Sequence, residues 1–289
     1  MRGIFVSNAF LEGRKFDEPA AMFGEAAEKA GIDLVTTDNS ELMSPIGTLP
    51  RIGDMDFVLF WDKDVRCARN LEVCGAKVFN PSSCIAVCDD KALTHLALRS
   101  HGVPSIETMS CPLCFGPYGD LGFLDRASET LGFPMVVKDC FGSFGQQVSL
   151  VNDMESLRER FRGPFVPRIL QRYVECGHRD VRVEVVGGRA VAAMSRVAPP
   201  GDFRSNATIG GTISAHSPTD EESELGIRAC EAVGADFAGV DILRSDEGDV
   251  VCEVNSNAHL RNLLDCTGVN AAEIILEHVM DSVRSVSYT

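Results

Sequence analysis

Long apolar runs are absent from this sequence of 289 residues, although 45% of the residues are hydrophobic. No stretch approaches the ~20 consecutive apolar residues of a membrane-spanning helix. The first apolar run also ends too soon for the ~7–15-residue core of a secretory signal. We therefore expect a soluble, cytoplasmic protein that binds no membrane. The length is sufficient for a sizeable core and about two domains.

Positive charge is also scarce. The chain has 27 Lys and Arg residues against 42 Asp and Glu residues, which gives a net charge of −15 and a pI of about 4.8. Such a surface repels phosphate backbones, so nucleic acid is not an expected partner. Any basic cluster must then be local, and we expect it to have a specific task.

Motifs of several common enzyme classes are missing. No Gly-x-Gly-x-x-Gly follows the first predicted strand, no Gly-Lys-Ser/Thr occurs, and neither His-Glu-x-x-His nor Gly-x-Ser-x-Gly is present. These absences argue against a dinucleotide-binding domain, a Walker A loop, a zinc peptidase of that type and a serine hydrolase.

Cysteine is plentiful, but its spacing is not that of a metal site or a disulfide framework. Cys111-Pro-Leu-Cys114 is the only Cys-x-x-Cys among the 11 cysteines, and no second pair completes a zinc site. We expect free thiols. A redox or metal role for Cys111 and Cys114 is the alternative.

Strands and helices alternate over the first 85 residues. The pattern predicts one helix at 17–30 and strands at 3–7, 32–36, 56–61 and 76–80. Strands separated by helices favour a parallel sheet covered by helices. We therefore predict an α/β domain over residues 1–85.

The pattern then changes. One helix is predicted from residue 82 or 83 through Asp90-Lys91 to residue 100, and two period-2 strands, 180–186 and 189–197, are joined by Gly187-Gly188. Further strands are expected at 135–139, 148–151, 168–174, 237–243 and 250–257, and further helices at 153–162, 219–235 and 270–283. Asp153 can cap the first of these helices, and Thr219 and Glu222 form a capping box at the start of the second. Antiparallel strands interleaved with helices indicate an α+β fold for this part of the chain.

The last predicted hairpin carries acidic residues on both strands. A three-residue turn at 246–248 places Ser245 opposite Asp249 and, counting back, Asp241 opposite Glu253. Side chains in direct cross-strand pairs have Cβ atoms roughly 4.5–5.5 Å apart, and like charges there destabilise a sheet. The pair therefore needs a compensating positive charge.

Asn255 shares the face of Glu253, whereas residues 250, 252 and 254 face the other way. Two carboxylates and an amide oxygen at this spacing suit a hard divalent cation, Mg²⁺ or Mn²⁺. The hairpin therefore predicts a metal site formed by Asp241, Glu253 and Asn255. A solvated hairpin whose acids face water is the alternative.

A second group of residues suits phosphate. Lys138 ends an apolar strand and is followed by a glycine-rich turn, 142–145, whose N–H groups can close on phosphate oxygens. Arg182, Arg196 and Arg204 could clamp a phosphate or a carboxylate, or simply offset surface acid. Since no dedicated nucleophile is present, phosphate and cation sites together favour ATP-driven chemistry.

Taken in order, these residues resemble the ATP-grasp superfamily, and most closely its RimK-like amino-acid ligases. The matching motifs span roughly residues 85–280: Asp90-Lys91, Phe133-Pro-Met-Val-Val-Lys138, Ile169-Leu-Gln-Arg-Tyr-Val174, Arg179-Asp-Val-Arg182, Gly201-Asp-Phe-Arg-Ser-Asn206, Ala238-Gly-Val-Asp241, Cys252-Glu-Val-Asn255 and Thr267-Gly-Val-Asn270. The resemblance implies an α+β ATP-grasp module of two subdomains, 86–174 and 175–289, that grips ATP. The α/β domain would complete the substrate cleft.

The resemblance also implies roles for individual residues. The metal ligands would be Asp241, Glu253 and Asn255, and the groups acting at the transferring phosphoryl and acyl groups would be Arg182, Arg204 and Asn206. The ATP-binding residues would be Lys91, Lys138, Gly142, Ser143, Gly145, Gln171, Arg172, Tyr173, Val174, Asp180 and Arg204. Within this set the lysines would contact phosphates, the strand 171–174 would read adenine through its backbone, and Asp180 would lie near the ribose. Arg172 departs from the family, which usually has Glu at this position.

The function implied is an ADP-forming carboxylate–amine ligase that makes an amide or peptide bond through an acyl phosphate, with ATP and Mg²⁺ or Mn²⁺ as cofactors. The amine is expected to be an amino acid, with glutamate as one candidate, and the carboxylate a peptide or small molecule. A homo-oligomer is compatible with the sequence. The alternative is a non-catalytic, ATP-binding regulatory protein of the same fold.

Overall fold

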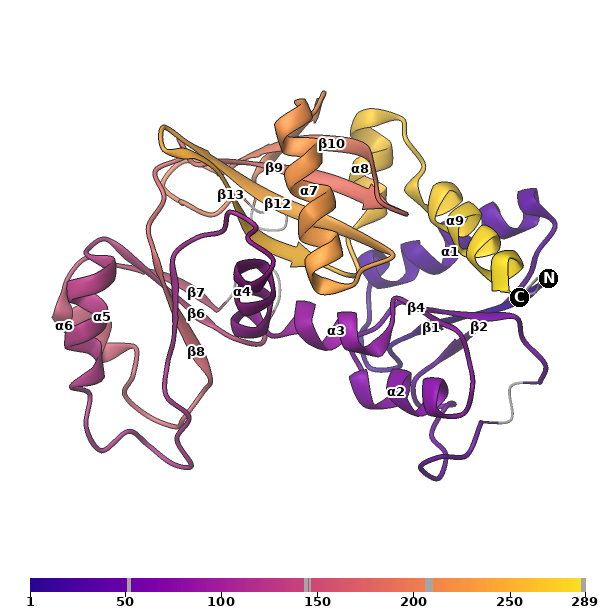
Figure 1. Ribbon diagram of the computed structural model, residues 1–289, viewed down its shortest axis with the longest axis horizontal. Coiled ribbons are helices and arrows are strands. Elements are labelled where there is room, and N and C mark those ends of the chain that lie inside the picture. The colour runs from indigo at the N-terminus through magenta and orange to yellow at the C-terminus, as the bar shows by residue number, and fades with distance from the viewer. Residues whose placement is uncertain (51–52, 143–144, 146, 206–209, 287–289) are drawn as a thin grey trace.

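Three sheets follow one another along the chain. The computed structural model describes residues 1–50, 53–142, 145, 147–205 and 210–286. In this part of the chain the strands form an N-terminal sheet of four strands, a second sheet of four strands and a central sheet of five. The central sheet lies between the other two, and the first and last described residues lie beside the N-terminal sheet (Figure 1).

The N-terminal sheet is parallel, in the order β2-β1-β3-β4. Its elements are β1 (Arg2–Ser7), α1 (Arg14–Ala30), β2 (Asp33–Asp38), β3 (Phe57–Phe60), α2 (Val65–Val73) and β4 (Val78–Phe79). The central strands β1 and β3 are buried along their length, as strands covered by helices on both faces should be. The α/β architecture predicted for this region is confirmed.

The second sheet is antiparallel, in the order β5-β8-β6-β7. Its elements are β5 (Thr108–Ser110), α5 (Phe123–Leu131), β6 (Met135–Asp139), β7 (Val148–Val151), α6 (Met154–Glu159) and β8 (Arg168–Arg172). Asp153 caps α6 as expected, in a capping box with Ser156. β5 and α5 were not predicted, because short elements among Pro and Gly carry little periodic signal.

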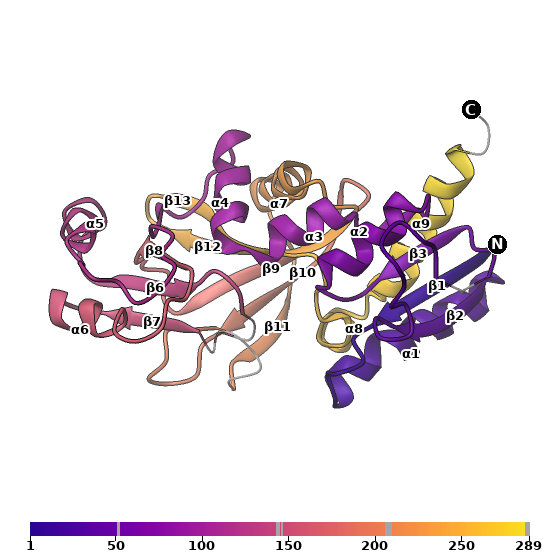
Figure 2. The same cartoon turned by 90° about the horizontal axis from the view of Figure 1, so that it is seen from below.

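The central sheet is antiparallel, in the order β11-β10-β9-β12-β13, and α7 covers one of its faces (Figures 1 and 2). Its elements are β9 (Arg179–Val186), β10 (Arg189–Val197), β11 (Thr212–His216), α7 (Asp220–Val233), β12 (Phe237–Ser245) and β13 (Gly248–Asn255). The predicted two-residue connection at Gly187-Gly188 is confirmed, with both glycines at positive φ, and so is the capping box of Thr219 and Glu222.

The single helix predicted from residue 82 to residue 100 is wrong, because Asp90 divides it. The backbone of Asp90 is extended (φ −96°, ψ 107°), and its carboxylate accepts hydrogen bonds from the N–H groups of Ala92 and Leu93. The chain therefore forms α3 (Ser82–Asp89) and α4 (Lys91–Ser100). An N-cap aspartate competes with helix continuation, and here it places Lys91 in the first turn of α4.

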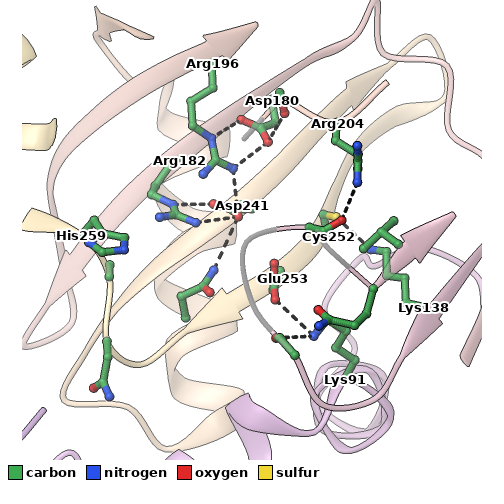
Figure 3. Close-up of a pocket in the computed structure, with 18 of the residues that line it drawn as sticks. Lys91, Lys138, Asp180, Arg182, Arg196, Arg204, Asp241, Cys252, Glu253 and His259 are labelled. Carbon is green, nitrogen blue, oxygen red and sulfur yellow. Dashed lines mark hydrogen bonds and ion pairs between the residues drawn. The ribbon is translucent and has the colours of Figure 1, made fainter. Parts of the chain in front are cut away.

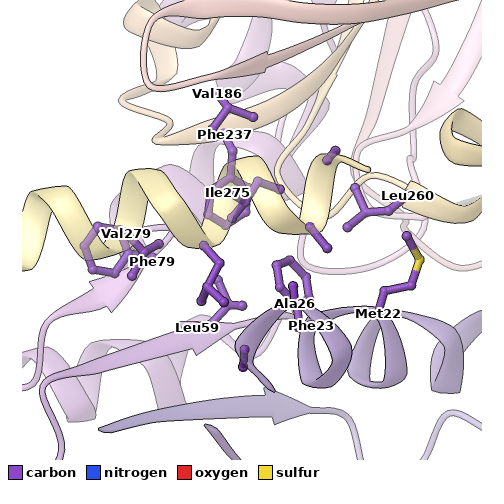
Figure 4. Close-up of a cluster of buried hydrophobic side chains, with 14 of the residues drawn as sticks. Met22, Phe23, Ala26, Leu59, Phe79, Val186, Phe237, Leu260, Ile275 and Val279 are labelled. Atoms are coloured by element: carbon purple, nitrogen blue, oxygen red, sulfur yellow. The ribbon is translucent and has the colours of Figure 1, made fainter. Parts of the chain in front are cut away.

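The C-terminal helices join the central sheet to the N-terminal sheet. After α8 (Leu260–Thr267), α9 (Ala271–Val286) packs on α1 in one hydrophobic cluster that also contains Leu59 of β3 and Phe237 of β12 (Figure 4). The domain boundaries near residues 85 and 174 remain a proposal, since α9 packs on the first domain. No helix in the described ranges is long and apolar enough to cross a membrane.

Candidate active site

The two faces of β9 differ in chemistry. Its buried apolar residues contact α7 in one hydrophobic cluster and are Val181, Val183 and Val185. Because successive side chains of a strand point to opposite faces, the residues between them project from the other face: Asp180, Arg182 and Glu184. Arg182 is in register with Asp241 of β12, and Asp180 with Arg196 of β10. A charged surface therefore crosses three neighbouring strands.

Apart from Glu184, this charged surface lines a cavity of about 570 Å³ to which all three sheets contribute. The cavity brings together every predicted site residue that the structure describes: Lys91, Lys138, Gly142, Gly145, Gln171, Arg172, Tyr173, Val174, Asp180, Arg182, Arg204, Asp241, Glu253 and Asn255. Ser143 and Asn206 lie outside the described residues. A cavity of this size suits a small-molecule ligand.

The hairpin of β12 and β13 brings Asp241 opposite Glu253, as predicted, but by a different route. The turn has two residues, not three, and Ser245 pairs with Gly248, so the predicted pairing of Ser245 with Asp249 is wrong. The register shifts by one residue at a β-bulge just beyond Asp241, which restores the predicted pair.

The bulge also changes which side chains reach the cavity. Val251 and Val254 are buried in the hydrophobic cluster, whereas Cys252 lines the cavity beside Glu253. The predicted orientation of Cys252 away from the cleft is therefore wrong. Alternation alone could not show this, because a bulge breaks the period of two.

Asp241 is neutralised by two arginines. The Arg182 guanidinium donates to both carboxylate oxygens, at 2.6 and 2.8 Å, and Arg196 Nη2 lies 2.9 Å from Oδ2 (Figure 3). Burial alone would raise the pKa of Asp241, but the arginines outweigh burial and lower it. Asn255 adds a contact of 3.5 Å from Nδ2 to Oδ2. Crowding of carboxylates on the hairpin therefore does not by itself require a metal ion.

Asp180 belongs to the same network. Arg196 donates to both of its oxygens at 2.6 Å, and the hydroxyl of Ser205 donates to Oδ2. Both partners of this pair are almost fully buried, with side-chain exposures of 7% and 9%. Arg196 thus holds Asp180 and Asp241 together.

Glu184 is the third charged residue of the β9 face and was not predicted. It is 2% exposed and pairs in register with Gly239 of β12. Ala258 also lies next to Gly239. Burial raises the pKa of Glu184 to about 7, against the nearby Arg182 guanidinium and with a further contribution from Asp241. The charge of Glu184 therefore changes close to neutral pH.

Two lysines face the hairpin from the second sheet and from α4. Lys138 is 9% exposed, and its Nζ lies 3.5 Å from the Sγ of Cys252. Lys91 donates to the carbonyl of Gly142 at 3.1 Å and lies 3.7 Å from Oε1 of Glu253 (Figure 3). Within the described ranges, no carboxylate lies within ion-pair distance of Lys138.

Gln171 of β8 is fully buried and held in one orientation. Its Nε2 lies 2.8 Å from both His95 Nε2 and Thr108 Oγ1, and the Thr108 hydroxyl donates to the carbonyl of Ile106. Burial lowers the pKa of His95 to about 3, helped by Lys138, so the ring is neutral and can accept. The Oε1 of Gln171 has no hydrogen-bond partner among the described residues.

Two of the predicted site arginines, Arg172 and Arg204, form ion pairs with carboxylates of the protein itself. The Arg172 guanidinium binds Glu107 at the exposed edge of the sheet, so this residue can offer the cavity mainly its backbone. Arg204 is paired with Asp202 and donates to the carbonyl of Gly145 at 2.6 Å. Arg204 therefore links Gly145 to the connection between β10 and β11.

Several cavity residues of the N-terminal domain were missed, among them Asn8, Trp61 and Asp62. They directly follow β1 and β3. Ligands commonly bind at the carboxyl ends of parallel strands, and this position in the sequence is the signal that could have identified them.

Cys111 and Cys114 do not line the cavity, and both are free thiols. Burial raises the pKa of Cys111 to about 12, which disfavours the reactive thiolate. Across the described ranges, no group of three or more His, Cys, Asp or Glu residues is placed to hold a metal ion. A cation in the cavity would thus depend on amide or ligand oxygens besides carboxylates.

Comparison with known proteins agrees with this geometry. Residues 88–279 match the RimK-like ATP-grasp domain. The chain is 34% identical to β-citrylglutamate synthase B of Homo sapiens over 231 residues, covering 78% of this chain and 58% of that protein. It is 37% identical to a probable α-L-glutamate ligase of Pseudomonas fluorescens over 237 residues, covering 80% and 75%. The chain thus spans little more than half the length of several curated relatives.

Solved structures show the same fold. A RimK-domain ATP-grasp protein of Sphaerobacter thermophilus superposes with a TM-score of 0.75 at 20% identity, covering 96% of this chain and 99% of that one. A D-alanine–D-alanine ligase of Bacillus anthracis superposes with a TM-score of 0.74 at 18% identity, covering 99% and 98%. The ordered motifs, the fold and the match over residues 88–279 together show that the chain belongs to the RimK-like ATP-grasp family.

Proposed function

We propose that this chain is an ATP-dependent carboxylate–amine ligase that forms an amide bond and releases ADP and phosphate. The observation that carries the proposal is the buried ammonium of Lys138, which has no carboxylate partner in the described part of the chain. A buried charge without a partner is costly, so the site calls for an anion. The phosphate groups of ATP would supply it.

The substrates are proposed from the relatives. The names β-citrylglutamate synthase and α-L-glutamate ligase both contain glutamate. We therefore propose an amino acid as the amine substrate, with glutamate as a candidate. The carboxylate substrate would be a peptide or a small molecule.

The nucleotide would lie between β8 and the glycine-rich turn. Lys91 and Lys138 would contact phosphates, the backbone of 171–174 the base, and Asp180 the ribose. The unpaired Oε1 of Gln171 can accept a hydrogen bond from an exocyclic amino group. Adenine carries such a group at the position where guanine has a carbonyl, so this oxygen favours ATP over GTP.

The hairpin residues fit a hard cation. Asp241, Glu253 and Asn255 offer carboxylate and amide oxygens from two adjacent strands to one cavity, which is the donor set of Mg²⁺ and also of Mn²⁺. A cation bound there would neutralise charge on the phosphate oxygens of ATP. The Asp241 carboxylate would contact this cation as well as Arg182 and Arg196, and the two arginines keep the carboxylate ionised.

The chemistry would then be phosphoryl transfer followed by acyl transfer. A carboxylate oxygen attacks the γ-phosphorus and ADP leaves; the amine attacks the acyl carbon, loses a proton, and phosphate leaves with one oxygen of the carboxylate. Arg182 and Arg204 would stabilise the negative charge that develops on the transferring groups. Asn206, outside the described residues, keeps its predicted role at the acyl group as part of the proposal.

The test is ADP release with Mg²⁺, screened over pairs of carboxylates and amino acids. We expect release that requires both an acid and an amine, and we expect Glu253→Gln to reduce it by tenfold or more. Glu247→Gln is the matched control, because Glu247 is exposed in the turn of the same hairpin. ATP binding without ADP release from any pair would favour the regulatory alternative.

A further inference from the structure

Asn80 joins the N-terminal sheet to the central sheet through one side chain. It follows β4 directly and is fully buried. Its neighbour Phe79 and the first residue of β12, Phe237, belong to one hydrophobic cluster (Figure 4). An amide without hydrogen-bond partners would be costly in such surroundings, so the partners of Asn80 determine where its side chain can lie.

The amide of Asn80 uses its full hydrogen-bonding capacity. Its Oδ1 accepts from the N–H groups of Asp236 and Phe237, at 2.8 and 3.2 Å. Its Nδ2 donates to the carbonyls of Phe237 and Ser256, at 2.9 and 3.0 Å. Because a backbone N–H only donates and a carbonyl only accepts, these four contacts fix the orientation of the amide. A single side chain thus holds the start of β12 and the residue that follows β13.

The two donated hydrogen bonds lie where the hairpin of β12 and β13 ends. The registered pairs of the two strands stop at Gly239 and Asn255. Phe237, at the start of β12, and Ser256, just after β13, lie beyond that pair, and the Nδ2 of Asn80 bridges their carbonyls. A side-chain amide has the donor and acceptor groups of a peptide unit, so Asn80 takes the place of a further hydrogen-bonded pair. The N-terminal domain therefore closes the end of the hairpin that carries Asn255.

A second contact from the N-terminal domain holds the same segment. The Nδ2 of Asn257 donates to the backbone carbonyl of Asp62 at 3.0 Å. Ser256 is 4% exposed, whereas the side chains of Asn255 and Asn257 line the cavity. Residues 255–257 are thus anchored at a buried carbonyl, with a cavity side chain on either side of the anchor.

We propose that Asn80 is a positioning residue, which holds the segment 255–257 and thereby places the amide of Asn255 among the cation ligands. Asn80 is buried and does not itself line the cavity. The inference rests on the proposed function, in which Asp241, Glu253 and Asn255 hold Mg²⁺. It gives the N-terminal domain a part in cation binding, because the end of the hairpin at Asn255 loses its hydrogen bonds when the Asn80 donor is removed.

Asn80→Asp tests the donor group alone. The new side chain keeps the oxygen that faces the N–H groups of Asp236 and Phe237, but a second oxygen replaces the donor and repels the carbonyls of Phe237 and Ser256. Calorimetric titration with ADP, once with Mg²⁺ and once with EDTA, gives two dissociation constants, and their ratio isolates the contribution of the cation. Loss of folded protein changes the number of sites but not this ratio.

We expect Mg²⁺ to tighten ADP binding to the wild type by about tenfold and Asn80→Asp to remove most of this gain, while the affinity for ADP in EDTA stays within about twofold. Asn255→Ala should lose the same gain. Asn80→Asp should add nothing to it, because substitutions that act through one residue are not additive. Asn80→Ser removes the amide without adding a charge, and it is the second variant if Asn80→Asp does not fold.

Asn70→Ala is the matched control. The amide of Asn70, in α2, also holds a loop of the N-terminal domain. It accepts from the N–H of Gly47 at 2.7 Å and donates to the Ser44 hydroxyl and the Thr48 carbonyl, at 3.2 and 3.4 Å. Since Asn70 does not line the cavity, Asn70→Ala should keep the gain from Mg²⁺.

The proposal is overturned if the folded Asn80 variant keeps the wild-type gain, if its affinity for ADP falls equally with and without Mg²⁺, or if its loss adds to that of Asn255→Ala. Loss of the gain in Asn70→Ala, or a wild type that gains nothing from Mg²⁺, would overturn it too. A retained gain in the Asn80 variant, together with ADP release from an acid and an amine, would keep the ligase and reject the positioning role. A lost gain, without ADP release from any pair, would do the reverse.

Discussion

Replacing Glu184 with Gln should stabilise the protein at alkaline pH far more than at acid pH. Burial raises the pKa of Glu184 from its ordinary value of 4.5 to about 7, despite the nearby Arg182. The folded form therefore binds a proton more tightly than the unfolded form. Stability from this group is full below about pH 4.5 and is lost as the pH rises to about 7. At 1.36 kcal/mol per pH unit, the loss between pH 5 and pH 8 is about 2–3 kcal/mol.

The assay is urea denaturation of wild type and Glu184→Gln at pH 5 and pH 8, followed by Trp61 fluorescence. Gln has nearly the same shape but does not titrate, so the difference in free energy of unfolding between the two proteins should grow by that amount. Glu247→Gln, at an exposed position, should give a constant difference. Parallel pH profiles for wild type and Glu184→Gln would refute the reasoning.

Two further substitutions address the charged groups of the cavity. Lys138→Met should raise the KM for ATP in the ADP-release assay by tenfold or more, since hydrogen bonds to charged groups contribute about 1.5–3 kcal/mol; an unchanged KM would contradict phosphate binding there. Arg196→Met should lower the free energy of unfolding by about 3–5 kcal/mol, because it leaves Asp180 buried without its arginine. Arg158→Met, which breaks an exposed pair, should cost less than about 1 kcal/mol in the same urea titration, and equal costs would contradict the account.

The sequence predicted the alternation of α/β and α+β regions well, because long periodic segments such as β9, β10 and α7 carry their own signal. The sequence also predicted two helix caps: Asp153 and Thr219 cap helices as expected. Asp90 shows the limit of this reading. The same residue type can lie inside a helix or begin one, and only tertiary packing decides between the two.

The hairpin of β12 and β13 shows how a correct pair can arise from an incorrect register. Asp241 and Glu253 do face each other, but a two-residue turn and a bulge produce the pair that a three-residue turn seemed to require. The prediction that a metal ion compensates the charge of this pair also left out the arginines. Arg182 and Arg196 come from other strands, and no spacing along the hairpin indicates that they neutralise Asp241.

The sequence predicted that the α/β domain completes the cleft, but it did not predict which residues of that domain line the cavity. Asn8 and Asp62 lie far from the ATP-grasp motifs in sequence, and they meet Asn257 only because α8 and α9 bring the central sheet onto the N-terminal sheet. Residues that converge through tertiary packing leave no periodic or spacing signal. They become visible only once the fold is known.

The central claim is that a carboxylate is activated by direct phosphorylation in this cavity. The most direct measurement labels both carboxylate oxygens of an accepted acid with ¹⁸O and determines the isotope content of the phosphate released with ADP. Transfer of one ¹⁸O atom into each phosphate is the predicted result. Phosphate without label, or release of AMP in place of ADP, would contradict the claim.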